Sequence, residues 1–301
     1  MRKSSLGNSL LLLLAAIIWG VAFVAQSAGM DYMGPLTFNA SRFIIGGIVL
    51  LPFALIAEKK KWNSIEEIFE RKRKLKITII GGICCGLAIC TASIFQQYGI
   101  LYTTVGKAGF ITALYIILVP IFGLLFKKRP RWIVWPGAVL AVCGLYLLCM
   151  SGAVTVNKGD LLLFCCAIVF TIHIMVIDYF SPKANGVALS CIQFLFSGIV
   201  CTILAFLFEQ PTWNAIIAGI VPILYAGVMS CGVAYTLQII GQKHVEPAVA
   251  SIILSLESVI SVLAGWILLQ EVLSKKEVFG CILMFIAVIL VQLPERKKKD
   301  V

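Results

Sequence analysis

Ten long runs of apolar residues constrain this chain more than any other feature. A run of about 18 or more such residues can cross a bilayer as an α-helix. Backbone amides cannot stay unpaired in hydrocarbon, so these runs form helices rather than open strands. Only 13% of the residues are charged, whereas soluble domains have about a quarter. We therefore predict an all-α membrane protein with ten transmembrane helices, at residues 9–29, 36–56, 77–99, 104–126, 132–150, 161–180, 187–208, 216–240, 247–269 and 278–293.

The 25 Lys and Arg residues are distributed unevenly over the ends of these runs. If ten helices alternate from a cytoplasmic N-terminus, most of these residues fall on the inner side, which is the positive-inside bias of membrane proteins. We expect a multi-pass protein of the plasma (inner) membrane with both termini in the cytoplasm. The net charge of +11 then reflects the lipid bilayer as partner, not nucleic acid. The outer side receives only Lys107, Lys158, Lys275 and Lys276.

The two halves of the chain match at nearly constant offsets. An offset of 151 residues places Phe43 on Phe194 and Gly47 on Gly198. We therefore expect two domains, residues 1–150 and 151–301, each a repeat of five helices. An odd number of helices per repeat inverts the second repeat in the membrane. Further along, an offset of 142 places Ala92 on Ala234, Gln96 on Gln238, Gly99 on Gly241, Ala108 on Ala250 and Gly123 on Gly265.

Inverted repeats are a recurring design of secondary transporters, with the substrate site near the bilayer midplane. Two similar halves of opposite orientation can each adopt either of two conformations, so inward-open and outward-open states come out close in energy. This favours transport over catalysis, with no catalytic residues, cofactor or metal. His173 and His244 are the only two histidines, they are far apart, and no metalloprotease or phosphate-loop motif is present. A polytopic membrane enzyme or a channel is the alternative.

Several short runs follow one another along the chain: AAIIWG at 15–20, NASRF at 39–43, YTT at 102–104, KAG at 107–109, LVP at 118–120, LESV at 256–259 and QE at 270–271. In this order and spacing they resemble the drug/metabolite transporter superfamily in its ten-helix branch of EamA-type permeases. The resemblance covers essentially the whole chain and implies a plasma-membrane permease for small metabolites, often acting as an exporter. The chain departs from the family's pattern at two positions. Ser258 stands where the family often has a proline, and Tyr115 stands at the position that the repeat pairs with Glu257, so the acidic residue is not duplicated.

Glu257 is the strongest candidate for the chemistry of transport. It lies near the middle of the run 247–269, and the repeat pairs it with Tyr115. An ionisable residue inside a membrane segment marks a functional site by default. Such a carboxyl group can take a proton from one side and release it to the other, or pair with a cationic part of the substrate. The structural alternative is a protonated glutamic acid bonded to a neighbouring hydroxyl or carbonyl group.

Four more candidate residues lie inside or at the ends of the apolar runs. Arg42 cannot lose its charge, so it must meet an anion, backbone carbonyls or water. It binds a substrate carboxylate or phosphate, forms a structural ion pair, or extends to the lipid headgroups. Asp178 and Lys107 lie near segment ends and are gating candidates, although Lys107 is also placed to reach the membrane interface. Pro120 either opens the backbone near the centre of its segment or makes a tolerated kink.

The remaining candidates are uncharged or titrate near neutrality. His173 relays protons or is a neutral, hydrogen-bonded core residue. The amides and aromatic rings would suit a small zwitterion or an aromatic metabolite if they face one cavity, and ordinary helix packing is the alternative for each ring. These candidates are Gln96, Gln193, Gln238, Asn39, Trp19 and Tyr235.

Overall fold

The computed structural model describes residues 2–57, 65–103, 105–127, 129–149, 157–269 and 274–293. Within these ranges the chain is helical and has no β-strand, in agreement with the all-α class. Thr104, residues 150–156 at the junction of the two halves, and the pair at 270–271 lie outside the described residues.

The first half contributes three long helices followed by three shorter ones. The third helix begins at Ile65, well before the predicted residue 77, because its first turns are charged and a hydropathy pattern cannot detect them. The helices are α1 (Arg2–Gly29), α2 (Pro35–Ala57), α3 (Ile65–Ile100), α4 (Val105–Thr112), α5 (Tyr115–Leu125) and α6 (Val134–Cys149).

The second half contributes more and shorter elements. Asn157 and Asn185 cap the first two helices through their side-chain oxygens, as asparagine commonly does. The predicted segment 216–240 begins in the last turn of one short α-helix and continues through a second α-helix, a π-helix and a third α-helix. The elements are α7 (Lys158–Phe180), α8 (Gly186–Phe208), α9 (Trp213–Ala218), α10 (Ile220–Leu224), the π-helix η1 (Tyr225–Ala234), α11 (Tyr235–Gln242), α12 (Pro247–Leu254), α13 (Leu256–Leu269) and α14 (Lys275–Gln292).

The fourth and ninth apolar segments are each interrupted near their middle. Residues 113–114 separate α4 from α5, and Ser255 separates α12 from α13. The interruptions match at the offset of 142, which places Ala113 on Ser255. Pro120 lies inside the continuous helix α5, so it does not open the backbone at its own position. The interruptions bring Tyr115 and Glu257 to the first turns of the helices that follow.

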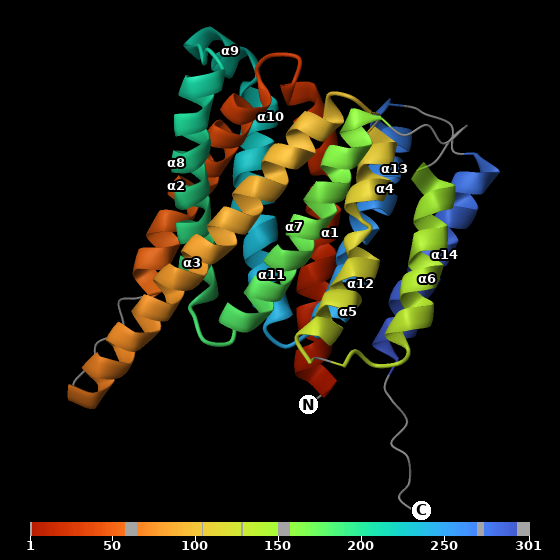
Figure 1. Ribbon diagram of the computed structural model, residues 1–301, viewed down its shortest axis with the longest axis horizontal. Coiled ribbons are helices and arrows are strands. Elements are labelled where there is room, and N and C mark those ends of the chain that lie inside the picture. The colour runs from red at the N-terminus through yellow and green to blue at the C-terminus, as the bar shows by residue number, and fades with distance from the viewer. Residues whose placement is uncertain are drawn as a thin grey trace, which may run out of the picture.

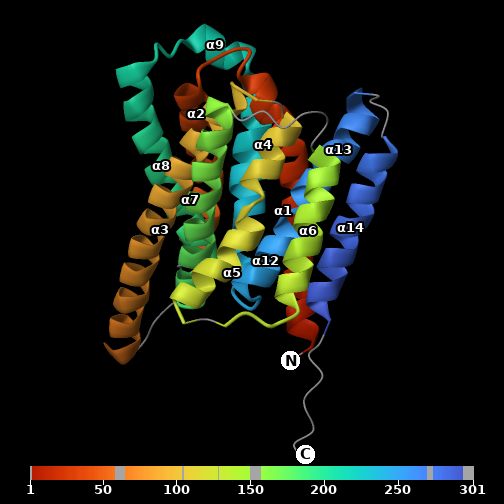
Figure 2. The same ribbon diagram turned by 45° about the vertical axis from the view of Figure 1, so that its right-hand side comes forward.

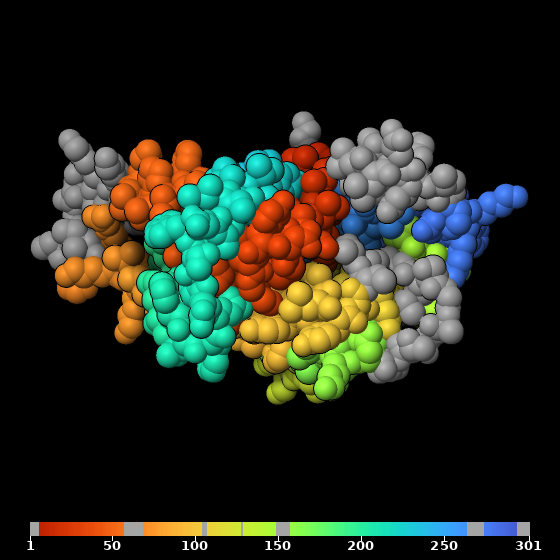
Figure 3. Space-filling view, turned by 90° about the horizontal axis from the view of Figure 1, so that it is seen from above, coloured from red at the N-terminus to blue at the C-terminus, as the bar shows by residue number. Residues whose placement is uncertain are grey.

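The helices stand side by side in a bundle, which α3 crosses obliquely (Figures 1 and 2). Seven segments of the described chain are long and apolar enough to cross a membrane. Two shorter apolar helices, Val134–Leu148 and Pro247–Leu263, accompany them. The start of α1 and the end of α14 lie at the same end of the bundle (Figure 1), and Figure 3 shows the opposite end, where α9 lies beside the start of α2.

Helices α2 and α8 pack closely through a reciprocal pair of contacts. The rings of Phe43 and Phe194 lie 5.6 Å apart. A Cβ atom added to Gly47 would lie 2.5 Å from the Leu195 side chain, and one added to Gly198 would lie 2.8 Å from the Ile44 side chain. The offset of 151 that pairs the two glycines also pairs Ile44 with Leu195. Each helix therefore presents the same small residue to the same kind of branched side chain on the other.

The last helix of each half packs against the other in a similar way. A Cβ atom on Gly144 of α6 would lie 2.9 Å from the carbonyl oxygen of Gly280, and one on Gly280 of α14 would lie 2.7 Å from the carbonyl oxygen of Gly144. Small residues allow the backbones of membrane helices to approach in this way. These contacts tie the two halves together away from the α2–α8 pair.

Candidate functional site

A buried cavity lies between helices of both halves. Its volume is about 40 Å³, which admits water but is far below the roughly 300–1,000 Å³ of typical metabolite sites. Each lining side chain is buried, with no more than 9% of its surface exposed. The cavity therefore lies in the interior of the bundle. The lining residues are Trp19, Phe23, Gln26, Arg42, Gln96, Thr112, Tyr115, Phe170, His173, Ile174, Ser230, Tyr235, Gln238, Leu254 and Glu257.

The paired residues of the two interrupted segments meet at this cavity. The Tyr115 hydroxyl group lies 3.1 Å from Oε1 of Glu257 and donates a hydrogen bond to it. Glu257 is in the first turn of α13, where the helix dipole stabilises negative charge. Gly20 of α1 lets this helix approach, because a Cβ atom there would lie 2.7 Å from the carbonyl oxygen of Glu257.

Arg42 is held in the interior of the bundle by neutral groups. Its Nε atom donates to Oδ1 of Asn39 and its Nη1 atom donates to Oε1 of Gln26, both at 2.9 Å. The guanidinium group also lies 4.9 Å from the centre of the Phe43 ring. With 3% of its surface exposed, Arg42 does not extend to the lipid headgroups.

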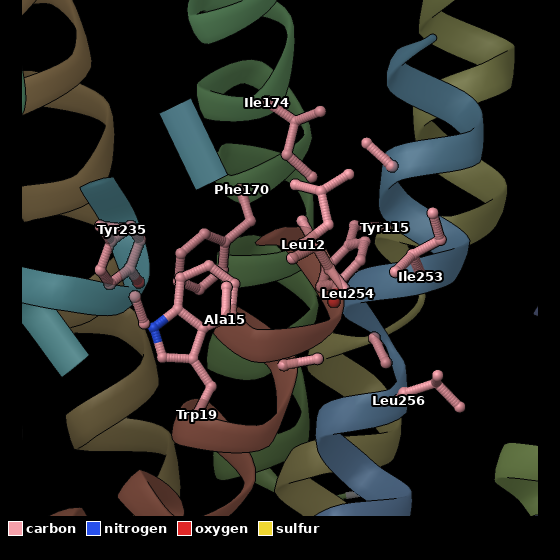
Figure 4. Packing of buried hydrophobic residues seen from close by; sticks show 14 of the residues in the cluster. Leu12, Ala15, Trp19, Tyr115, Phe170, Ile174, Tyr235, Ile253, Leu254 and Leu256 are labelled. Carbon is pink, nitrogen blue, oxygen red and sulfur yellow. The ribbon is translucent and has the colours of Figure 1, made fainter. Parts of the chain in front are cut away.

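Aromatic rings and a histidine form one wall of the site. Figure 4 shows the Trp19 indole extending from α1 toward Tyr235, with Phe170 of α7 beside it. The ring centres of Trp19 and Tyr235 lie 4.5 Å apart, and those of His173 and Tyr235 lie 6.0 Å apart. Nε2 of His173 is 3.2 Å from Oε1 of Gln193. Gln193 thus supports the wall from α8 and does not line the cavity.

Several polar atoms of the lining are buried without a hydrogen-bond partner among the described residues. Unpaired polar atoms in an interior are costly, and buried groups normally have a partner. Four such atoms around one cavity provide donors and acceptors for a bound molecule. They are Nε1 of Trp19, Oγ1 of Thr112, Nδ1 of His173 and Oε1 of Gln238.

The three gating candidates lie away from the cavity lining. Lys107 forms a largely buried ion pair, in which its Nζ atom lies 2.6 Å from Oδ2 of Asp160. This pair connects the start of α4 with the capped start of α7. Asp178 lies near the end of α7, and Pro120 lies within α5.

The sequence candidates thus converge on one place. Eight of the ten line the cavity, and Asn39 and Gln193 contact lining residues. Sequence reasoning missed Gln26 and Thr112, although both had a signal. Gln26 lies two turns after Trp19 on the same face of α1, and Thr112 lies one turn before Tyr115. Across the described residues, no group of three His, Cys, Asp or Glu side chains could hold a metal ion.

Comparisons with known proteins agree with this architecture. The model of the EamA-like transporter family matches residues 7–150 and 157–293. An uncharacterized transporter of Archaeoglobus fulgidus is 32% identical over 94% of this chain and 84% of its own length. The uncharacterized transporter YwfM of Bacillus subtilis is 27% identical over 97% of this chain and 95% of its own length.

The inner membrane transporter YedA of Escherichia coli, also uncharacterized, is 23% identical over 92% of this chain and 88% of its own length. A solved crystal structure superimposes with a TM-score of 0.77, covering 95% of this chain and 96% of that one at 18% identity. At this identity the likeness shows the fold alone.

Proposed function

This chain belongs to the EamA-like transporter family and is a multi-pass membrane transporter; from that premise we propose that it is a secondary active carrier of small metabolites. In this proposal, residues 1–150 and 151–301 form two inverted repeats of five transmembrane helices each. The carrier alternates the access of the central cavity between the two sides of the inner membrane. Both termini lie in the cytoplasm, and the direction is export, as the family resemblance implies.

The observation that carries the proposal is the cavity itself. Both halves contribute to it, its lining is buried, and four of its polar atoms have no partner within the described residues. Buried polar groups normally have a partner, and these four atoms can bond a ligand that enters the cavity. The volume of about 40 Å³ further suggests an occluded conformation, which must expand to admit a metabolite.

Matching features of the two halves support the inverted repeat. The interruptions of the fourth and ninth apolar segments match at the offset of 142, which places Ala113 on Ser255. The contacts of Gly47 with Leu195 and of Gly198 with Ile44 are reciprocal, as expected for surfaces related by a two-fold axis. Interrupted helices at corresponding positions near the substrate site are typical of transporters with inverted repeats.

Ion pairs near the two ends of the bundle support the alternation of access. Lys107 and Asp160 connect α4 to α7. Near the other end, Arg131 lies 3.4 Å from Glu246, and its Nη2 atom donates to the carbonyl oxygen of Val291 at 2.6 Å. Each pair links a residue of the first half to one of the second. Opening either end requires the linked elements to separate there while the other end remains closed.

Glu257 is the proposed coupling residue. Its carboxyl group lines the cavity and has the Tyr115 hydroxyl group as hydrogen-bond partner. It would take up a proton while the cavity faces one side and release it after the cavity has changed sides. The substrate is driven against its own gradient by that exchange.

Transport by purified protein in proteoliposomes tests the function. A panel of labelled amino acids, organic acids, sugars and nucleosides is offered with and without an excess of unlabelled compound on the opposite side. Saturable uptake that is accelerated by this counterflow indicates a carrier. Uptake that never saturates indicates a channel, and a chemically altered compound indicates an enzyme, so either result contradicts the proposal.

A further inference from the structure

The charge of Arg42 is not neutralised by any described residue. Its two hydrogen-bond acceptors, Gln26 and Asn39, are neutral amides. Among the described residues, no carboxylate lies within 4 Å of it, since the ion pairs found there involve Arg73, Lys107 and Arg131. A guanidinium group stays protonated in proteins, and a buried charge without a counter-ion is costly. Arg42 forms no ion pair among the described residues and is too deeply buried to reach the lipid headgroups. Of the three roles expected from the sequence, the binding of a substrate anion is left.

The orientation of Arg42 is set by a second contact behind it. Nδ2 of Asn39 donates to the carbonyl oxygen of Ser93 on α3 at 3.2 Å, which turns the amide oxygen toward Nε of Arg42. The Phe43 ring supports the guanidinium group at 4.9 Å. These contacts use two of the five N–H groups that a guanidinium group carries. A planar cation with donors left for one more acceptor suits a carboxylate, which accepts two parallel hydrogen bonds.

Glu257 does not supply that acceptor. It lines the same cavity as Arg42 but is bonded to Tyr115, on α5. The ion pairs of the described residues do not include one between Arg42 and Glu257. The first half therefore contributes a permanent cation to the cavity, and the carboxyl group of the second half is held elsewhere in it.

We infer that the transported compound carries a carboxylate that binds Arg42, with Asn39 and Gln26 as positioning residues. This inference rests on the proposed function, because it assigns the chemistry of the substrate to the same cavity. A site built to bond a particular group rejects analogues that lack the group far more strongly than a site that reads shape alone. The cavity should therefore discriminate by at least about tenfold between a carboxylate and its neutral or cationic counterpart.

Thermal unfolding of the full-length protein in detergent, with matched compounds, tests the inference. A ligand that binds the folded state raises its unfolding temperature. A broad metabolite panel would include leucine, 4-methylpentanoate and 3-methylbutylamine, which share an isobutyl group, together with the corresponding phenylalanine series and neutral sugars and nucleosides. We expect every stabilising compound to carry a carboxylate, whether or not it also carries an amine.

Gln26→Glu is the most informative variant. It keeps an acceptor oxygen for Nη1 of Arg42 and nearly the same shape, but it supplies a carboxylate that neutralises the guanidinium group. Binding of the stabilising carboxylates should weaken by at least about tenfold. Arg42→Lys keeps the charge without the planar fork and should retain the preference for carboxylates at lower affinity, whereas Arg42→Gln should lose it. Arg73→Gln removes a charge from the exposed start of α3 and serves as the matched control.

The outcomes separate the inference from the proposed function. If neutral compounds or simple amines stabilise the protein as well as the carboxylates do, or if Gln26→Glu binds carboxylates as tightly as the unchanged protein, the inference is wrong and the carrier function stands. If no compound of the panel stabilises the unchanged protein, the cavity is not a metabolite site and both proposals fail.

Discussion

Tyr115 and Glu257 occupy matching places in the two halves, directly after matching helix interruptions, yet one is a phenol and the other a carboxylic acid. Arg42 and Gln193 differ in the same way at the offset of 151, whereas Gln96 and Gln238 agree at the offset of 142. The similarity therefore lies in the backbone and in uncharged side chains, and the difference lies in the charged ones. We interpret the shared backbone as the basis of alternation and the unequal charges as the basis of substrate binding and coupling.

The halves also differ in one stretch of backbone. Residues 83–92 of α3 are regular α-helix, and their counterparts at the offset of 142 form the π-helix η1 (Tyr225–Ala234). A π-helix bonds each amide five residues back and is found often at functional sites. The wider turns lead directly into α11, whose Tyr235 and Gln238 line the cavity. Among the described residues, only the second half has this wider stretch beside the site.

Replacing Glu257 with Gln should reduce proton-driven transport more than any other single change. Glutamine keeps the size of the side chain but cannot exchange a proton. Coupling between two ligands typically amounts to about 1–3 kcal/mol, or roughly 5–150-fold. The rate of transport driven by a pH gradient should therefore decrease by a factor of about 5–150, and transport should lose its pH dependence. Flux in proteoliposomes with and without a pH gradient measures this.

Tyr115→Phe is the matched variant from the other half. It removes the hydrogen bond to Glu257 and keeps the acid, so flux should decrease while its pH dependence persists. Unchanged flux and pH dependence in Glu257→Gln would show that the acid is structural.

Gly47→Ala and Gly198→Ala test whether the two halves contribute equally to the α2–α8 contact. The new methyl groups would lie 2.5 Å from Leu195 and 2.8 Å from Ile44, and overpacking typically costs about 1–3 kcal/mol. We expect similar losses from the two variants in equilibrium unfolding, because the contacts are reciprocal. Gly7→Ala, with no atom within 4 Å of the new methyl group, should not destabilise. Losses that differ by several kcal/mol would argue against related halves.

Lys107→Met tests the ion pair between the halves. It leaves Asp160 largely buried without its cation, so we expect a loss of about 1–2 kcal/mol, less than for a fully buried pair. Arg73→Met removes an exposed pair with side chains about 70% exposed, which should change stability by less than about 0.5 kcal/mol. Thermal unfolding of both variants measures the difference. Equally small shifts of the unfolding temperature in the two variants would show that the Lys107 ion pair does not help to hold this end closed.

Gln96→Leu and Gln238→Leu give the smallest expected effect. Each removes a neutral amide from the cavity, and a neutral hydrogen bond is worth about 0.5–1.5 kcal/mol. Ligand affinity should fall about two- to tenfold in both variants if the substrate contacts both halves. A loss in only one variant would place the substrate against that half.

Several features were visible in the sequence because they depend on local chemistry. The apolar runs predicted helices, because lipid excludes unpaired amides, and α7 and α8 begin within a few residues of the expected positions. The repeat placed Tyr115 and Glu257 at equivalent positions of the two halves, but it did not predict the hydrogen bond between them. The interruption at Ser255 was not predicted, because a hydropathy pattern reports exposure to lipid and not the bonding of the backbone.

The composition and the spacing of the apolar runs are enough to exclude a soluble fold. They predict a bundle of apolar helices with a few buried polar residues. Only the tertiary structure decided which of those residues share a cavity. Gln26 and Asn39 acquire their importance from contact with Arg42, and Lys107 forms an ion pair with Asp160. Such partners come from elements brought together by helix packing, and a helix sequence does not specify which face of its neighbours it will meet.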